Sequence, residues 1–232
     1  INLLVNTFVG ISIGSNVVIA TLIGQNKEKK AKQAVHTSML FAVILGVILM
    51  AFGLLIAPQL LRLMATPSNI LSLAVLYLRI YFLGVPFIVL YNFEAAILRS
   101  RGETRLPLIA LSIAGVINVI LNLVFVVGLG MSVDGVAYAT VISNIFSSLF
   151  LLIYLTHDTT ITHFTFKQCH IHKDLLLHIL KIGIPSGMQG ALFSISNVII
   201  QSQLNQFGSY AIAGSAAALN FEILSYYFFE GF

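Results

Sequence analysis

The sequence predicts an all-α membrane protein, a polytopic helical bundle, and three observations support this fold class. The 232 residues are 58% hydrophobic and 9% charged, with a mean hydropathy of +0.98. A soluble domain carries about a quarter charged residues, so the composition argues strongly against a soluble fold. The apolar residues are grouped in stretches of about 20, the length that crosses a bilayer as a helix. Alternating segments of about ten residues, typical of a membrane β-barrel, are absent from the sequence.

Seven apolar stretches are long enough to be membrane-spanning helices, and each ends at a polar or turn-forming connector. The first three stretches cover residues 3–24, 36–57 and 70–98. They end at a lysine-rich segment, at MATPSN and at an arginine-rich segment, respectively. The next two are separated by GLGMSVDG and cover residues 106–128 and 133–155. The last two follow a long polar connector, are separated by NQFGSY, and cover residues 176–207 and 211–232. Since the chain lacks an initiator Met and both ends are apolar, we expect an internal piece of a longer membrane protein.

The charge of the connectors alternates along the chain. Lysines, arginines and histidines gather in 24–33, 99–105 and 156–174, while the intervening connectors hold one acid or none. By the positive-inside rule, these three basic connectors are expected on the cytoplasmic side of a multi-pass protein in the cell membrane. The net charge of +4 is explained by this topology, so no nucleic-acid partner is expected.

The polar connector 156–174 predicts a boundary between two lobes. We expect an N-terminal lobe of five helices at 1–156, a cytoplasmic linker at 157–173, and the first two helices of a C-terminal lobe at 174–232. Cys169, His170 and His172 are better explained as solvated linker than as metal ligands, because the cluster is short, so no metal site is predicted.

Two Gly-x-x-x-Gly patterns, Gly10–Gly14 and Gly183–Gly187, would let helices approach closely. Because glycine is common in membrane helices, ordinary packing explains each pattern equally well.

The sequence lacks signatures of catalysis, such as a metalloprotease motif, a nucleophile elbow or a phosphate loop, so no enzyme is expected. Polar residues inside the apolar stretches are more informative, since such groups usually face a bundle interior or a cavity. Asn118 and Asn122 lie one turn apart on one face of a helix, and Thr140 and Asn144 have the same spacing in the next stretch. These groups would either line a polar site or hold two helices together by hydrogen bonds.

The sixth stretch carries a wider polar arc. Ser186, Gln189, Ser196, Asn197 and Gln201 fall within roughly half of the helix circumference. An uncharged arc of this kind suits a wet cavity for organic cations, and it also suits packing between lobes. Gln189, Asn197 and Gln201, with Asn144, are therefore the candidate cavity residues.

Two glutamates lie in or near the apolar stretches. Glu94 lies about five residues before Arg99, so we expect it near the interface and paired with an arginine. Glu222 lies deeper, where an ionised carboxylate is costly, so it should be protonated, ion-bound or facing water. We take Glu222 as the candidate for coupling to a proton or a cation.

Four segments resemble transporters of the multidrug and toxic compound extrusion (MATE) family. They begin GISIGSNVV, YLRIYFLGV, INVILNLVF and KIGIPSGMQ, and they cover residues 10–38, 77–108, 117–143 and 181–208. The resemblance implies a twelve-span fold of two pseudo-symmetric six-helix lobes, of which this chain would hold spans two to eight. It also implies a monomer in the bilayer that exports small cationic, lipophilic drugs or toxic metabolites in exchange for Na⁺ or H⁺, with no other cofactor.

The resemblance also implies a place for the coupling ion. Members of the family hold a cation between an acid on the first span, an Asn and an Asp on the fifth, and a Thr on the sixth, and the matching positions here are Asn118, Asn122 and Thr140. Asn122 stands where some members carry Asp, which implies weaker cation binding. Phe193 and Ser194 stand where some members place a Glu in the seventh span, so Glu222 is the expected second-lobe acid.

Two other functions remain open. A lipid-linked oligosaccharide flippase of the same superfamily would need several basic residues for a pyrophosphate, whereas only Arg79 is a candidate here. A membrane receptor or structural protein that does not transport is the alternative from another class.

Overall fold

Helices form almost all of the described chain. The structure, a computed structural model, describes residues 2–63, 68–166 and 170–204, together with Gly214, Ala218, Phe221 and Glu222. In chain order the helices are α1 (Asn2–Gly24), α2 (Glu28–Leu63), α3 (Ser68–Arg99), α4 (Arg105–Asn122), the π-helix η1 (Leu123–Gly128), α5 (Val133–His157) and α6 (Lys173–Leu204). Six segments are long and apolar enough to cross a membrane, which confirms the all-α polytopic fold. Most of the seventh predicted stretch, 211–232, lies outside the described residues.

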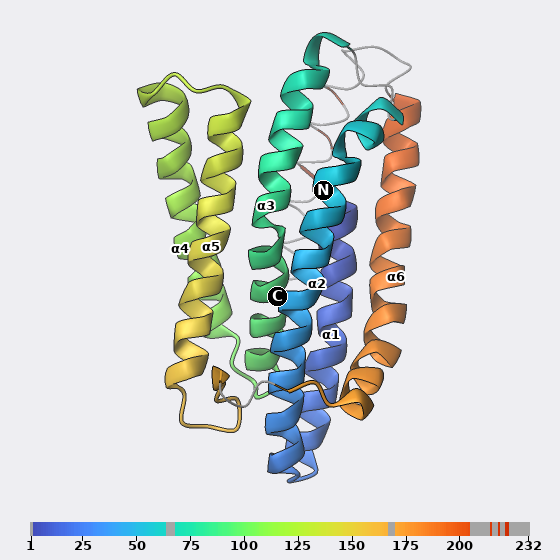
Figure 1. The fold of residues 1–232 in the computed structure, drawn as a ribbon, viewed down its shortest axis with the longest axis vertical. Helices are drawn as coiled ribbons and strands as arrows, with labels where there is room; N and C mark the ends of the chain where they lie inside the picture. The colour runs from blue at the N-terminus through green and yellow to red at the C-terminus, as the bar shows by residue number, and fades with distance from the viewer. Residues whose placement is uncertain are drawn as a thin grey trace.

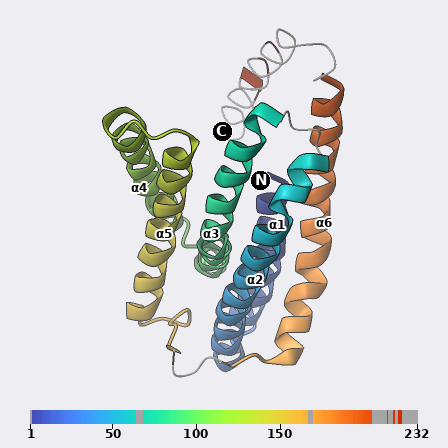
Figure 2. The ribbon, with the colours of Figure 1, turned by 45° about the horizontal axis from the view of Figure 1, so that its top comes forward.

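The helices pack side by side in an order that differs from the chain order. The antiparallel pair α4 and α5 lies at one side of the bundle, and α3 lies next to α5 (Figure 1). Helices α1 and α2 pack on α3, and α6 lies along α1 at the far side. Figure 2 shows the same order after a turn of 45°. The described part of the chain therefore forms a group of five helices, α1–α5, with α6 attached mainly through α1.

The three basic connectors lie at one end of the bundle, the lower end in Figure 1. The lysine-rich connector 24–33 is mostly helical, because α2 begins at Glu28 and not at the predicted residue 36. Hydropathy detects only the apolar part of a helix, whereas Glu, Lys, Gln and Ala are good helix formers in any surroundings. Helix α2 thus begins with polar turns ahead of its apolar stretch.

The outward surface of the bundle is apolar. Large hydrophobic side chains are exposed along the helices, including Leu55 at 75%, Val127 at 76% and Leu192 at 63%. Exposed apolar surface of this extent in water would mark an interaction site. On helices of this length and hydropathy, it is the surface that faces lipid.

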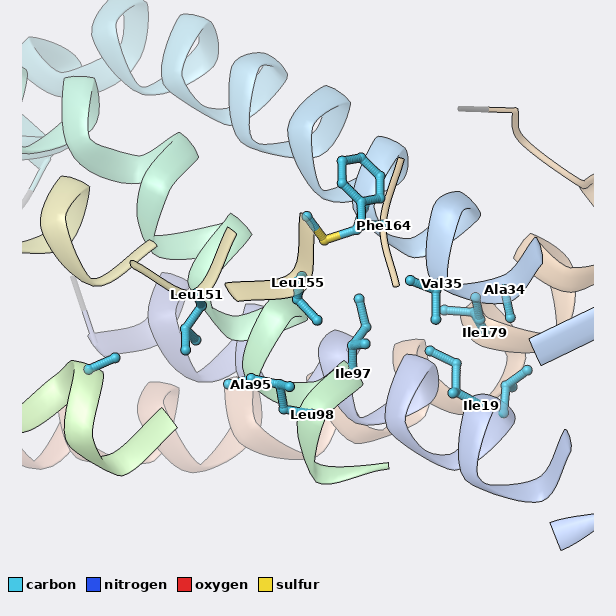
Figure 3. Close-up of a cluster of buried hydrophobic side chains, with 13 residues drawn as sticks. Ile19, Ala34, Val35, Ala95, Ile97, Leu98, Leu151, Leu155, Phe164 and Ile179 are labelled. Atoms are coloured by element: carbon cyan, nitrogen blue, oxygen red, sulfur yellow. The ribbon is translucent and has the colours of Figure 1, made fainter. Parts of the chain in front are cut away.

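The buried core joins residues from distant parts of the chain. Figure 3 shows one hydrophobic cluster of buried side chains. It joins Ile19 of α1, Val35 of α2, Ile97 of α3, Leu155 of α5 and Ile179 of α6 with Phe164 of the connector between α5 and α6. Phe164 is 4% exposed although it belongs to the connector between α5 and α6. Part of the connector between α5 and α6 therefore packs into the hydrophobic core.

Hydrogen bonds to α2 also hold the connector. The Thr165 backbone N–H donates to Nε2 of His36 at 3.1 Å, and Nδ1 of His36 donates to the Lys32 carbonyl. Further along, the His172 backbone N–H donates to the Thr37 hydroxyl at 3.2 Å. These hydrogen bonds fasten the connector to α2 at His36 and Thr37.

The two Gly-x-x-x-Gly patterns pack against each other. A Cβ atom on Gly10 would lie 2.5 Å from the Cα atom of Gly187. A Cβ atom on Gly14 would meet the carbonyl oxygen of Ile179 and would lie 2.8 Å from the backbone nitrogen of Gly183. The expected close approach of helices is confirmed, and we call this contact between α1 and α6 the glycine seam.

Candidate cation site between α4 and α5

A cluster of amides and hydroxyls lies where α4 and α5 pack antiparallel, and it includes three of the predicted site residues. Nδ2 of Asn122 donates to Oδ1 of Asn118 at 3.0 Å, as expected for residues one turn apart. Nδ2 of Asn118 lies 3.5 Å from Oγ1 of Thr140 and 3.4 Å from Oγ of Ser143. The short connector between the helices brings the two faces together. We call Asn118, Asn122, Thr140 and Ser143 the amide cluster.

One oxygen of the amide cluster is left over. Oδ1 of Asn122 is buried and has no hydrogen-bond partner. A buried carbonyl without a partner costs about 1–3 kcal/mol, so such a group calls for an explanation. The helix changes from α to π geometry immediately after Asn122, and π-helical turns are frequent at functional sites.

The chemistry of the cluster suits a hard cation. Amide and hydroxyl oxygens are the neutral ligands that such ions accept, and the unpartnered Asn122 oxygen is free to turn toward one. The four side chains of the cluster carry no charge. A cation here would therefore gain coordination but little Coulomb attraction, and an acid from another helix would strengthen its binding.

The other predicted site residues are not brought into this cluster. Asn144 lies on α5 one turn beyond Thr140, is partly exposed, and has no hydrogen bond to Asn118 or Asn122. Gln189 is exposed on α6, at the opposite side of the bundle. Asn197 and Gln201 also lie on α6, with side chains outside the described part of the structure. Glu222 is exposed, and most of its chain neighbours lie outside the described residues, so its role stays a prediction.

The expectation for Glu94 is wrong. Its carboxyl group is fully buried and accepts a hydrogen bond from Ser148 of α5 at 3.3 Å instead of pairing with an arginine. Position along the chain placed Glu94 near the end of a helix, but only packing decides which way a side chain faces.

An ion pair that was not predicted from the sequence joins the α3–α4 connector to the end of α5. Nη1 of Arg101 lies 2.6 Å from Oδ2 of Asp158, and Arg101 also donates to Tyr154, Thr160 and Thr162. The connector after α3 holds three arginines, and nothing in their spacing distinguishes Arg101. The pair lies at the end of the bundle where the basic connectors gather.

We expect Arg101→Gln to lower the free energy of unfolding by about 3 kcal/mol, because it leaves a buried carboxylate without its counter-ion. The Asp158 side chain is 5% exposed, so water cannot replace the guanidinium. The exposed Arg99 provides the control, since Arg99→Gln should change stability by less than about 0.5 kcal/mol. Denaturation in detergent measures both variants, and equal losses would contradict the assigned role of Arg101.

Acid should weaken this contact. Burial raises the pKa of Asp158, but hydrogen bonds from Thr160 and Thr162 and the charge of Arg101 together hold it below its ordinary value. A carboxyl with a lowered pKa stabilises the fold above its unfolded value of about 4 and loses this contribution as the pH falls further. Asp158→Asn should therefore be less stable than the native protein at pH 7, and the difference should shrink below about pH 4. A difference that is constant across this range would contradict the titration of Asp158.

Comparison with known proteins identifies the family. Residues 1–124 match the model of the protein family described as MatE. The chain is 34% identical over 218 residues to the "Probable multidrug resistance protein YoeA" of Bacillus subtilis (strain 168), covering 91% of this chain and 47% of the relative. It is 28% identical over 201 residues to the "Multidrug export protein MepA" of Staphylococcus saprophyticus, covering 87% of this chain and 45% of the relative. The chain thus spans about half the length of the curated relatives it matches.

Solved structures support the same assignment. A MOP superfamily transporter from Pyrococcus furiosus superposes with a TM-score of 0.86 at 27% identity, over 96% of this chain and 50% of the other. An inward-facing and an outward-facing structure of a multidrug resistance MATE family transporter both give a TM-score of 0.83 at 26% identity. These two cover 93% and 95% of this chain and 50% and 49% of the other. Since both the family model and the helix arrangement match, the chain belongs to the MATE family, a family of transporters and not of enzymes.

Proposed function

We propose that the complete protein containing this chain exports cationic, lipophilic compounds in exchange for Na⁺ or H⁺ moving inward. The observation that carries the proposal is the unpartnered carbonyl oxygen of Asn122 beside Asn118 in a membrane-spanning helix pair. If these amides only held two helices together, each of their oxygens would be expected to accept a hydrogen bond. A site for a transient ion leaves an oxygen available until the ion arrives.

In this proposal α1–α5 form most of one lobe and α6 begins the other. Residues 1–156 belong to the first lobe, 157–173 link the lobes on the cytoplasmic side, and 174–232 open the second lobe. The docking of the linker on α2 through His36 and Thr37 supports a fixed start for α6. The two lobes then alternate access to a site near the middle of the membrane.

The organic cation would occupy a cavity on the side of α6, with Gln189, Asn197 and Gln201 as its polar lining. The fourth predicted cavity residue, Asn144, lies on α5 at the other side of the bundle and would not contribute to this lining. Uncharged amides orient a substrate by hydrogen bonds without fixing one shape, which suits varied compounds. Glu222 would supply the acid of the second lobe. The protein would work as a monomer in the cell membrane.

Reconstitution of the complete protein in liposomes tests the proposal. The native protein should expel ethidium when a Na⁺ or a H⁺ gradient is imposed. Asn118→Ala should slow this efflux at least about tenfold, which corresponds to about 1.4 kcal/mol of lost transition-state stabilisation. Asn92→Ala is the matched control, because the Asn92 amide lies in a span but donates only to the Ile88 carbonyl of its own helix.

Two outcomes would contradict the proposal. Native protein that moves no ethidium under either gradient would argue against drug export, and movement of a lipid-linked sugar instead would favour a flippase. Equal efflux by Asn118→Ala and Asn92→Ala would leave export intact but would remove the amide cluster from the coupling mechanism.

A further inference from the structure

Glu94 is a buried acid that the amide cluster does not use. It lies in the membrane-spanning part of α3, Leu71–Arg99, and its side chain is 0% exposed. Its Oε2 atom accepts a hydrogen bond from Ser148 of α5 at 3.3 Å, while its Oε1 atom is buried without any partner. A carboxyl group in this position is either a costly defect or a functional site.

No counter-ion stands beside it. Among the described residues, Arg101 and Asp158 form an ion pair, whereas Glu94 forms none. The nearest titratable groups on α3 are Tyr91 and Arg99, and Arg99 is exposed.

The helices packed against α3 offer Glu94 no close charge of their own. Helix α1 has no titratable residue. At the end of the bundle with the basic connectors, α4 carries Arg105, and α5 carries Tyr154 and His157. The basic start of α2 at 28–32 is followed by His36, whose ring nitrogens contact the Lys32 carbonyl and the Thr165 N–H and not Glu94. The surroundings therefore favour the uncharged, protonated form of Glu94, since an ionised carboxylate in a low-dielectric interior needs a counter-ion.

Buried serines of α5 contact both Glu94 and the amide cluster. The hydroxyls of Ser143 and Ser147 donate to carbonyls of their own helix, so they form no continuous hydrogen-bonded chain. Ser148, Ser147 and Ser143 of α5 are 0%, 1% and 5% exposed. Ser148 bonds to Glu94, and Ser143 lies 3.4 Å from Nδ2 of Asn118. Ser143 and Ser148 are five residues apart, so their positions on α5 differ by about 7.5 Å along the helix axis and by about 140° around it. This offset is not the distance between the two charges, but charges in a low-dielectric interior interact over longer distances than this.

We propose that Glu94 is a proton-binding site of the helix bundle, coupled to the amide cluster through α5. This inference rests on the proposed transport function. A cation in the amide cluster attracts negative charge and so favours ionised Glu94. The O–H bond of the carboxyl then breaks, the electron pair stays on the carboxylate, and the proton passes to water at the nearby connector end of α3. When the cation leaves, Glu94 takes up a proton again, so the two positive charges exchange.

Infrared titration of the complete protein in detergent tests the site without requiring transport. The carbonyl band of a protonated carboxyl should be present in the native protein near neutral pH, should lose intensity as the pH rises, and should be weaker by one carboxyl group in Glu94→Gln. The exposed acid Glu28 provides the matched control, and Glu28→Gln should keep the band. A titration difference between native protein and Glu94→Gln that lies at the pH of an ordinary exposed glutamate, or no titration at all, would overturn the proposal.

Two further measurements separate proton binding from structural packing. Ser148→Ala removes the hydroxyl that stabilises the carboxylate, so the midpoint of the band should move to higher pH by about one unit. This result does not depend on the folding of Glu94→Gln. Addition of Na⁺ to native protein, which would bind in the amide cluster, should move the midpoint to lower pH and release protons into the medium. If the midpoint were unchanged in both measurements, Glu94 would be a packing residue and the proposed proton site would be wrong.

The transport assay keeps the two proposals distinguishable. Native protein that expels ethidium while Glu94→Gln moves the same number of protons per ethidium would overturn only the role of Glu94. Native protein that expels no ethidium would overturn the proposed export, and the infrared titration would still decide whether Glu94 binds a proton.

Discussion

Gly14→Ala is expected to destabilise the protein by about 3 kcal/mol, because the added methyl group has no space in the glycine seam. The atoms it would meet are the carbonyl oxygen of Ile179 and the backbone of Gly183, which cannot turn away as a side chain can. Helix α6 must therefore move off α1 or the two helices must separate. Thermal denaturation of the purified protein, together with cross-linking between α1 and α6, measures both effects.

Gly115→Ala is the control for this prediction. Gly115 lies in α4, and a Cβ atom there would meet nothing within 4 Å. Replacing an unconstrained helical glycine with alanine stabilises a helix by about 0.5–1 kcal/mol, so this variant should be at least as stable as the native protein. If Gly14→Ala behaved like Gly115→Ala, the close approach of α1 and α6 would be wrong.

Asn122→Asp is expected to tighten cation binding about tenfold, because it places a negative charge at the oxygen that now lacks a partner. The carboxylate would still accept a hydrogen bond, but it could no longer donate one to Asn118, so Oδ1 of Asn118 would also turn toward the ion. The concentration of Na⁺ or H⁺ that gives half-maximal ethidium efflux measures the change in affinity.

A substitution that removes the polar atoms of Asn122 gives the contrasting result. Asn122→Leu keeps a similar volume, removes both polar atoms, and should abolish ion-driven efflux while the protein stays folded in the membrane. An Asn122→Asp variant with unchanged ion dependence, or an Asn122→Leu variant with native efflux, would exclude Asn122 as a ligand.

Most of the fold could be predicted from hydropathy, because a bilayer requires helices of a fixed apolar length. The predicted stretch 133–155 corresponds to α5 at Val133–His157, and 70–98 corresponds to α3 at Ser68–Arg99. The main error was the start of α2, where charged helix formers extend the helix beyond the apolar part. The change to π geometry after Asn122 gave no hydropathy signal, since it alters hydrogen bonding without altering composition.

The site was only partly predictable for a related reason. The spacing of Asn118 and Asn122 is local, so one helical turn is enough to place them together. The contacts of Glu94 with Ser148 and of Arg101 with Asp158 join residues more than 50 positions apart, and they depend on how α3 packs against α5. Composition identifies such polar residues as candidates, but only the tertiary structure selects their partners.

The glycine seam has a mechanical consequence. Because main-chain atoms meet directly at these glycines, Gly183 and Gly187 of α6 present no side chains that would have to change rotamer when the two helices tilt. Small rotations about the seam should therefore meet a low barrier, while any widening would forfeit the dispersion contacts of two closely spaced backbones. Such a joint would permit rocking and resist separation.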